Sequence, residues 1–171
     1  MNIFYLDKEP QIAAHYHNDK HVVKMILESA RMLSTAHREL DGDDDGTLYD
    51  ADDIIYRATH KNHPSTVWVR DNAKHYQWLY NLFESLCDEY THRYGKEHLT
   101  DSKLREILRF QPFFIDTNKR FTQPPQCMPD EYKVDGNSVA AYRNYYMGEK
   151  SGFAKWSKRQ TPPWWNNNNH E

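Results

Sequence analysis

The sequence predicts a mainly α-helical protein: a single-domain helical bundle with long C-terminal loops and at most a short N-terminal strand. Its 171 residues fit one domain and can bury a sizeable core. Apolar residues recur at three-and-four spacing between Gln11 and Leu40, where no glycine or proline interrupts them. Aromatic residues make up 14% of the chain, against 38% for all apolar residues. The core is therefore expected to rely heavily on rings.

Two long helical stretches are expected in the first half of the chain. Residues 1–6 are a short apolar start, either one β-strand or an extended segment, and the periodic run after them predicts one long helix or two in sequence. An acidic loop follows. A second long helix is expected from Pro64 to Gly95, where glycine supplies the stop. Its buried stripe is predicted to contain Trp68, Asn72, Tyr76, Leu79, Phe83, Leu86 and Tyr90.

The second half is expected to contain less helix. A short helix is predicted to start at the Asp101-Ser102 cap and to end at Pro112. Residues 111–136 hold four prolines without periodicity, so they predict an ordered surface loop. A last helix is expected to start near residue 137 and can extend as far as Trp156.

Composition indicates the compartment and the domain limits. Cys87 and Cys127 are forty residues apart, which fits neither a disulfide framework nor a Cys-x-x-Cys pair. No run approaches the ~20 apolar residues of a membrane helix, and the N-terminus does not resemble a signal peptide. We expect a cytoplasmic protein with no membrane partner, in which residues 1–165 form a single helical domain and residues 166–171 a frayed polar tail.

Charge is distributed unevenly along the chain. The net charge of −3 alone argues against a simple polyanion binder. Residues 39–53 hold eight acidic residues and no basic one, whereas basic residues outnumber acidic ones in the last thirty positions. The position of charge is therefore more informative than its sum.

The densest cluster of titratable residues lies in the first long helix. There His17, His21, Lys24 and Glu28 are predicted to form one polar stripe, with Lys20 beside it. Such a stripe is often only the outer face of an amphipathic helix. The functional interpretation is acid–base or Schiff-base chemistry, which uses imidazoles, amines and a carboxylate. All five residues are therefore candidate catalytic residues.

Two patterns suggest a metal ion. The spacing His-x-His-x-Asp-x-His over residues 15–21 is close to a zinc-hydrolase signature, so a metal-dependent hydrolase is one alternative. The acidic loop resembles an EF-hand calcium loop in which Asp replaces the usual last Glu, although a merely solvated acidic loop is the favoured interpretation. No cofactor is expected to be required. If a divalent cation binds weakly, its candidate ligands are Asp41, Asp43, Asp45 and Asp52.

Two groups of residues are candidates for nucleic-acid contact. The first lies at the turn before the second long helix, where a helix N-terminus favours anions, although a capped, exposed loop is the alternative. The second lies in the C-terminal third, where rings that can stack on unpaired bases alternate with basic residues that can meet phosphates. Some of these rings are equally expected in the core. The candidates are His60, Lys61 and His63 in the first group, and Arg143, Lys150, Lys155, Trp156, Lys158 and Arg159 in the second.

Five pieces of the sequence form a recognisable set: Met1-Asn2-Ile3-Phe4, Asp19-Lys20-His21-Val22-Val23-Lys24-Met25, His60-Lys61-Asn62-His63-Pro64, Glu89-Tyr90-x-x-Arg93-Tyr94-Gly95-Lys96 and Met128-Pro129-Asp130-Glu131-Tyr132. They resemble a family of small, largely uncharacterised proteins from bacteriophages and microbes.

The chain also has a looser layout: a His and a Glu seven residues apart (His21 and Glu28), the turn His63-Pro64, a long helix that ends in Glu89-x-x-x-Arg93-Tyr94-Gly95, and an aromatic, basic tail. This layout is remotely similar to phage pyrimidine-dimer DNA glycosylases of the endonuclease V type, which are small, all-helical, and act through an amine nucleophile and a Glu.

This resemblance implies a DNA N-glycosylase, with or without lyase activity, that acts on damaged or modified pyrimidines. Glu28 would support cleavage of the glycosidic bond. The related enzymes use the α-amino group of a small second residue, but Asn2 disfavours removal of Met1. The nucleophile is then Lys20 or Lys24, or the lyase step is absent. Single-stranded, damaged or modified DNA is the expected partner, and a non-catalytic binder of nucleic acid or of a nucleotide messenger is the alternative. The sequence does not predict the oligomeric state.

Overall fold

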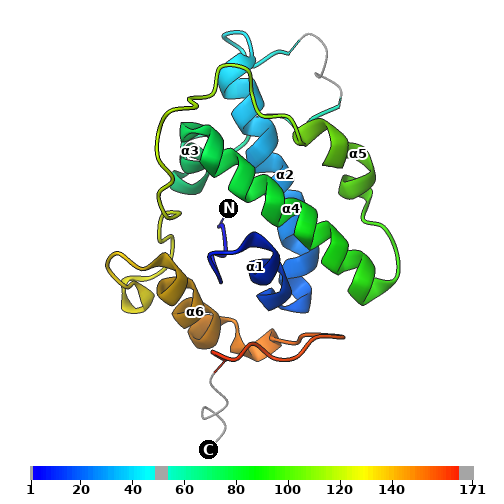
Figure 1. Ribbon diagram of the computed structural model, residues 1–171, viewed down its shortest axis with the longest axis vertical. Helices are drawn as coiled ribbons and strands as arrows, with labels where there is room; N and C mark the ends of the chain where they lie inside the picture. The colour runs from blue at the N-terminus through cyan, green and yellow to red at the C-terminus, as the bar shows by residue number, and fades with distance from the viewer. Residues whose placement is uncertain (1, 49–53, 166–171) are drawn as a thin grey trace, which may run out of the picture.

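A computed structural model describes residues 2–48 and 54–165, and this part of the chain is helical and contains no β-strand (Figure 1). The predicted mainly α class is therefore confirmed, while the predicted tail, residues 166–171, lies outside the described residues. The α-helices are α1 (Pro10–Tyr16), α2 (Asp19–Asp41), α3 (Pro64–Asp71), α4 (Ala73–Tyr94), α5 (Leu99–Leu108) and α6 (Ser138–Glu149), and the short 3-10 turns are η1 (Asp130–Tyr132) and η2 (Ser151–Phe153).

The first long helical stretch is two helices in sequence, preceded by a buried extended segment. Ile3 to Leu6 are buried without forming a strand. The chain leaves the helical conformation at His17 and Asn18, and the Asn18 side chain then accepts a hydrogen bond of 2.9 Å from the backbone amide of His21. This side chain caps α2 and starts the helix anew.

The predicted second long helix also divides into two, α3 and α4. Asn72 is extended, with a φ of −159°, and its side chain caps α4 by accepting from the amide of His75 at 3.0 Å. The helix ends as predicted at Gly95, whose left-handed φ of 69° is a conformation that favours glycine.

Helix boundaries in the second half differ from the prediction. The cap of α5 is the ring of His98 rather than Asp101, whose carboxylate instead pairs with Arg105 at 2.6 Å. The helix ends at Leu108, before Pro112 is reached. The last helix, α6, ends at Glu149, so Trp156 lies well beyond it.

The core lies between α2 and α4, which cross in the centre of the molecule, with α1 and α3 packed against them (Figure 1). Rings fill much of this core, as the composition predicts. The largest fully buried side chains include Tyr76, Phe83, Tyr142 and Tyr146. Among the helices described, none is long and apolar enough to cross a membrane.

Candidate active site

The polar face of α2 carries an ion pair in its middle. The ammonium of Lys24 lies 3.7 Å from a carboxylate oxygen of Glu28. The side chain of Lys24 is 66% exposed, whereas that of Glu28 is only 16% exposed. Arg31, one turn further along, is also exposed. Glu28 is therefore a largely enclosed carboxylate beside an exposed amine.

His63, at the start of α3, lies close enough to this carboxylate for its pKa to respond to the charge. Its ring caps the helix by accepting from the amide of Ser65 at 3.1 Å. Burial lowers the pKa of His63, the positive charge of His60 lowers it further, and the negative charge of Glu28 opposes them. His60 itself is exposed, in a left-handed conformation with a φ of 48°. The turn and the polar face of α2 thus meet at Glu28.

His21 does not belong to the exposed face, contrary to the predicted stripe. Its ring is buried, packs on Phe4 with ring centroids 4.4 Å apart, and lies 2.6 Å from the hydroxyl of Tyr146. Burial lowers its pKa to about 3, with further lowering by the positive charges of His17, Lys150 and Lys24. The ring is therefore neutral at neutral pH and supplies no charge for a phosphate.

His17 is also misplaced by the stripe prediction, because the helix breaks just after it. It is the C-terminal cap residue of α1 rather than part of α2, and it is fully buried. Its Nδ1 lies 2.6 Å from the carbonyl oxygen of Ala13, and burial lowers its pKa to about 4. Of the predicted catalytic set, the exposed face retains Lys20, Lys24 and Glu28.

Two further basic residues belong to the same side of the molecule as Lys24. The ammonium of Lys20 lies 4.8 Å from the ring centre of Phe153, and that of Lys150 lies 6.0 Å from the same ring. Lys150 and Lys24 both lower the pKa of His21, whose ring centre lies 5.9 Å from that of Phe153. We call Lys20, Lys24 and Lys150 the lysine patch.

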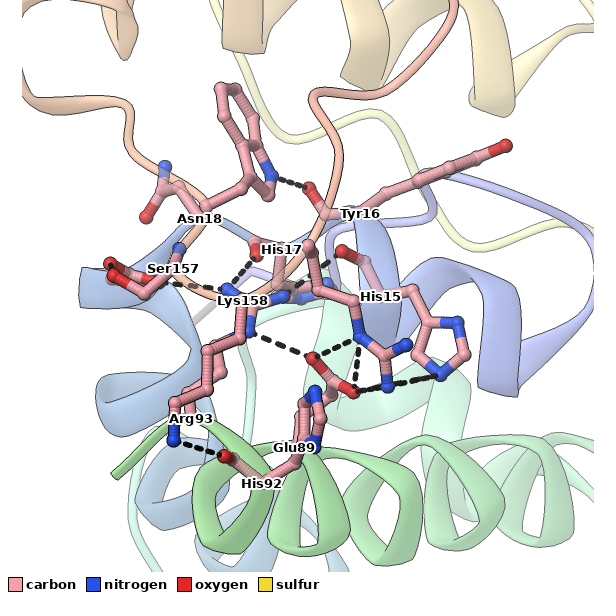
Figure 2. Close-up of polar contacts among 12 residues, drawn as sticks. His15, Tyr16, His17, Asn18, Glu89, His92, Arg93, Ser157 and Lys158 are labelled. Atoms are coloured by element: carbon pink, nitrogen blue, oxygen red, sulfur yellow. Dashed lines mark hydrogen bonds and ion pairs between the residues drawn. The ribbon is translucent and has the colours of Figure 1, made fainter. Parts of the chain in front are cut away.

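Residues 154–165, here called the C-terminal segment, are fixed across α1, α2 and α4 by a polar network (Figure 2). The indole of Trp156 donates to the carbonyl of Tyr16 at 2.8 Å, and Ser157 donates to the carboxylate of Asp19. Arg159 forms a two-pronged ion pair with Glu89, and Lys158 donates to the carbonyl of His92 at 3.2 Å. These contacts are made to the protein's own groups.

The candidate residues of the C-terminal third therefore divide into two sets. Arg143 joins the fold, because its guanidinium donates to the carbonyl of Leu6 at 2.9 Å and pairs with Asp7. Trp156 and Arg159 hold the C-terminal segment in place. Lys155 is exposed and Lys150 half-exposed, and both can reach a partner.

Residues 1–102 match the pyrimidine dimer DNA glycosylase family, which is more than half of the chain. The chain belongs to this family. The remote resemblance drawn from the His-Glu spacing and the His-Pro turn is thereby confirmed. The match contains Lys24, Glu28 and His63, whereas the C-terminal segment lies outside it. No curated protein and no solved structure matches the chain.

Sequence reasoning missed the polar network beneath the C-terminal segment. Arg93 is completely buried and donates to Glu89 at 2.8 Å, to Asp19 at 3.0 Å and to the carbonyl of His17 at 2.8 Å. Burial alone would raise the pKa of Glu89, but hydrogen bonds and positive charge from Arg159 and Arg93 outweigh it and lower that pKa. The available signal was the Glu-x-x-x-Arg spacing at the end of the long helix.

The acidic loop is not arranged as the EF-hand comparison predicts. The carboxylate of Asp41 accepts the backbone amides of Phe113 and Phe114, and Asp45 accepts the amide of Thr47. Within residues 2–48 and 54–165, no group of three or more acidic, His or Cys side chains is placed to hold a metal ion. Asp43 is exposed, and Asp52 lies outside the described residues. Weak cation binding here stays a prediction.

Lys61 is exposed and lines a surface hollow of about 560 Å³ together with this acidic loop. The hollow also contains Arg38, whose guanidinium donates to the carbonyls of Gly46 and Tyr56. The candidate residues of this turn therefore have different surroundings. His63 lies near Glu28, whereas Lys61 lies near the carboxylates of the acidic loop.

Proposed function

We propose that this protein is a DNA N-glycosylase that releases damaged or modified pyrimidines, with Glu28 as its catalytic carboxylate. The observation that carries the proposal is the setting of Glu28: it is largely enclosed, 3.7 Å from the amine of Lys24, and close to His63. All three residues lie in the part of the chain that matches the pyrimidine dimer DNA glycosylase family.

This arrangement suits cleavage of a glycosidic bond. Positive charge develops on the sugar as the base departs, and a fixed carboxylate at its side stabilises that charge. An amine that attacks the sugar C1′ forms a carbon–nitrogen bond while the base leaves with the electrons of the glycosidic bond. Loss of the amine proton and ring opening then give a Schiff base. Lys24 is the first candidate for this amine, because it is exposed and adjacent to Glu28, and Lys20 is the second.

DNA would be held by the lysine patch and by Lys155. Phosphate groups attract clustered ammonium groups, and the release of counterions drives such binding. Phe153 lies between Lys20 and Lys150 and offers a half-exposed ring on which a base can stack. The neutral, buried His17 and His21 support the surface from below rather than bind phosphate.

Borohydride trapping tests the proposal on a duplex that contains a single pyrimidine dimer. Reduction turns a Schiff base into a permanent link between protein and DNA, and peptide mapping then identifies the linked amine. We expect the link at Lys24. A link at Lys20 moves the nucleophile by one turn of the same helix, whereas a link at the N-terminal amine contradicts the helical assignment.

The same experiment separates glycosylase from binder. Formation of an abasic sugar without trapping indicates a glycosylase that lacks the lyase step. Tight binding with neither bond cleavage nor trapping indicates a non-catalytic nucleic-acid binder, which the lysine patch would equally support. The metal-dependent hydrolase has less support, because the described residues offer no group of metal ligands.

A further inference from the structure

Three phenylalanines project from the loop that follows α5. Phe110, Phe113 and Phe114 are 69%, 85% and 70% exposed, and the last two rings lie edge to face with centroids 5.0 Å apart. Their neighbours Pro112 and Ile115 are buried and anchor the loop. Single exposed apolar residues are ordinary on a protein surface, but clustered rings mark an interaction site.

The backbone that carries these rings is held in place. The carboxylate of Asp41, at the end of α2, accepts the amide of Phe113 at 2.6 Å and that of Phe114 at 2.9 Å. At the start of the loop, the hydroxyl of Tyr76 donates to the carbonyl of Leu108 at 2.6 Å. The loop passes the C-terminal end of α2 and descends past α3 (Figure 1). Because this backbone is already ordered, binding of a partner to the rings would cost little conformational entropy in the loop.

Carboxylates follow Asp41, the residue that holds the backbone of the rings, along the chain. The loop after Asp41 carries Asp43, Asp44 and Asp45, all exposed, and these line the hollow of about 560 Å³ described above. Negative charge repels a phosphate backbone, so this surface is unsuited to DNA. It attracts a partner with positive charge.

We propose that Phe113 and Phe114, together with Asp43, Asp44 and Asp45, form a docking surface for a protein segment that combines aliphatic and basic side chains. A cationic amphipathic helix has this chemistry: its apolar face covers the rings and its lysine or arginine side chains meet the carboxylates. The surface lies at the opposite end of α2 from Lys20, so both surfaces can be occupied at once. This inference does not depend on the proposed glycosylase activity.

Fluorescence anisotropy with a labelled amphipathic Leu/Lys helical peptide tests the docking surface on the full chain. The double substitution Phe113→Ser and Phe114→Ser removes the rings and keeps the buried anchors, and it should weaken peptide binding at least about tenfold. Leu99→Ser, which replaces a residue that is 66% exposed at the start of α5, is the matched control and should leave binding unchanged.

Four outcomes would overturn the proposal. Wild-type peptide binding by the Phe113→Ser, Phe114→Ser protein would show that the rings do not bind the peptide. Equal binding of a Leu/Glu peptide and the Leu/Lys peptide would show that the carboxylates do not select a basic partner. Sedimentation that shows a dimer lost in the double variant would assign the rings to self-association. A loss of duplex DNA affinity in the double variant, with peptide binding unaffected, would assign them to nucleic acid.

Discussion

Two histidines that the sequence suggests as exposed acid–base residues are buried in the structure. His17 and His21 are buried and are enclosed by the rings of Phe4 and Tyr146. Burial holds the pKa of His17 at about 4 and that of His21 at about 3. Both rings therefore stay neutral in the folded protein under conditions where an exposed histidine gains a proton.

This predicts that the protein loses stability on mild acidification. In the unfolded chain these histidines titrate near ~6.5, so between that pH and about 4 the unfolded state binds more protons than the folded state. The free energy of unfolding should fall as pH drops through this window, by up to about 1.4 kcal/mol per pH unit for each ring. Urea unfolding measured at several pH values between about 7.5 and about 5 checks this.

The matched variant is His17→Gln, which removes one of the two proton-binding rings. Its stability should depend less steeply on pH than that of the wild type, whatever its stability at neutral pH. His92→Gln, which replaces an exposed histidine on α4, should keep the wild-type slope. A pH-independent free energy of unfolding in the wild type would refute the assignment of neutral, buried rings.

At the scale of the elements, periodicity predicted which segments are helical but not where they break. The spacing of apolar residues located both long stretches, and Gly95 ended the second as expected. The interruptions at Asn18 and Asn72 contain no glycine or proline. They arise because an asparagine side chain accepts a hydrogen bond from the backbone amide of the residue three positions later. Whether an asparagine breaks a helix in this way or stays within it depends on tertiary packing.

The candidate site was predictable where it depends on one helix face. The i, i+4 spacing predicted the neighbouring positions of Lys24 and Glu28, and the His-Pro turn predicted the start of a helix at Pro64. The pairing of Arg159 with Glu89 joins positions 70 residues apart. No local pattern encodes such a contact, so Arg159 was predicted to face nucleic acid when it in fact anchors the C-terminal segment.

The C-terminal segment should detach from the helices when Glu89, the buried carboxylate that pairs with Arg159, is replaced by a neutral residue. Glu89→Gln leaves the enclosed guanidinium of Arg93 with only Asp19 as a charged partner, which should cost about 3 kcal/mol of stability. Arg159→Gln should cost less, because Arg93 still pairs with Glu89 and Arg159 is partly exposed. In both variants trypsin should cleave after Lys155 and Lys158 faster than in the wild type.

Arg105→Gln provides the control for this prediction. Arg105 also bridges two carboxylates, those of Asp88 and Asp101, but it lies on α5. Its replacement can lower stability without exposing the C-terminal segment. Equal trypsin cleavage rates for Glu89→Gln and the wild type would show that the network does not hold the segment.

For the whole molecule, the arrangement of charge matters more than the net value of −3. The lysine patch lies at the start of α2 and the acidic loop follows its end. The 23 residues of this helix separate the two regions by roughly 34 Å. Under the proposed function, DNA would be attracted to one end of the molecule and repelled from the other, which would direct it to the face that contains Glu28.

DNA binding should therefore weaken with salt, and the exposed lysines should set the slope. Replacing Lys150 and Lys155 by glutamine removes two phosphate contacts and should reduce the slope of log affinity against log salt by roughly 1.8 on duplex DNA. Phe153→Leu should weaken binding to damaged or single-stranded DNA with the slope unchanged, because stacking releases no counterions. Titrations between ~50 and ~200 mM salt measure both effects.

Lys103→Gln on α5 is the control, since this lysine is exposed but lies outside the lysine patch. It should alter neither affinity nor slope. Loss of the salt dependence in Lys103→Gln, or its persistence at full strength in the double variant, would place the DNA elsewhere on the molecule.

The most direct test of the central claim is the single-turnover rate at which Glu28→Gln cleaves the glycosidic bond in a duplex that carries one pyrimidine dimer, measured as formation of the abasic sugar. Glutamine has nearly the shape of glutamate but no charge, so the rate should fall at least about a hundredfold, with the melting temperature little changed. Glu39→Gln, an exposed substitution on the same helix, should cleave the bond at the wild-type rate. A Glu28→Gln protein that cleaves the bond as fast as the wild type would contradict the account and would leave the face of α2 as a solvated surface.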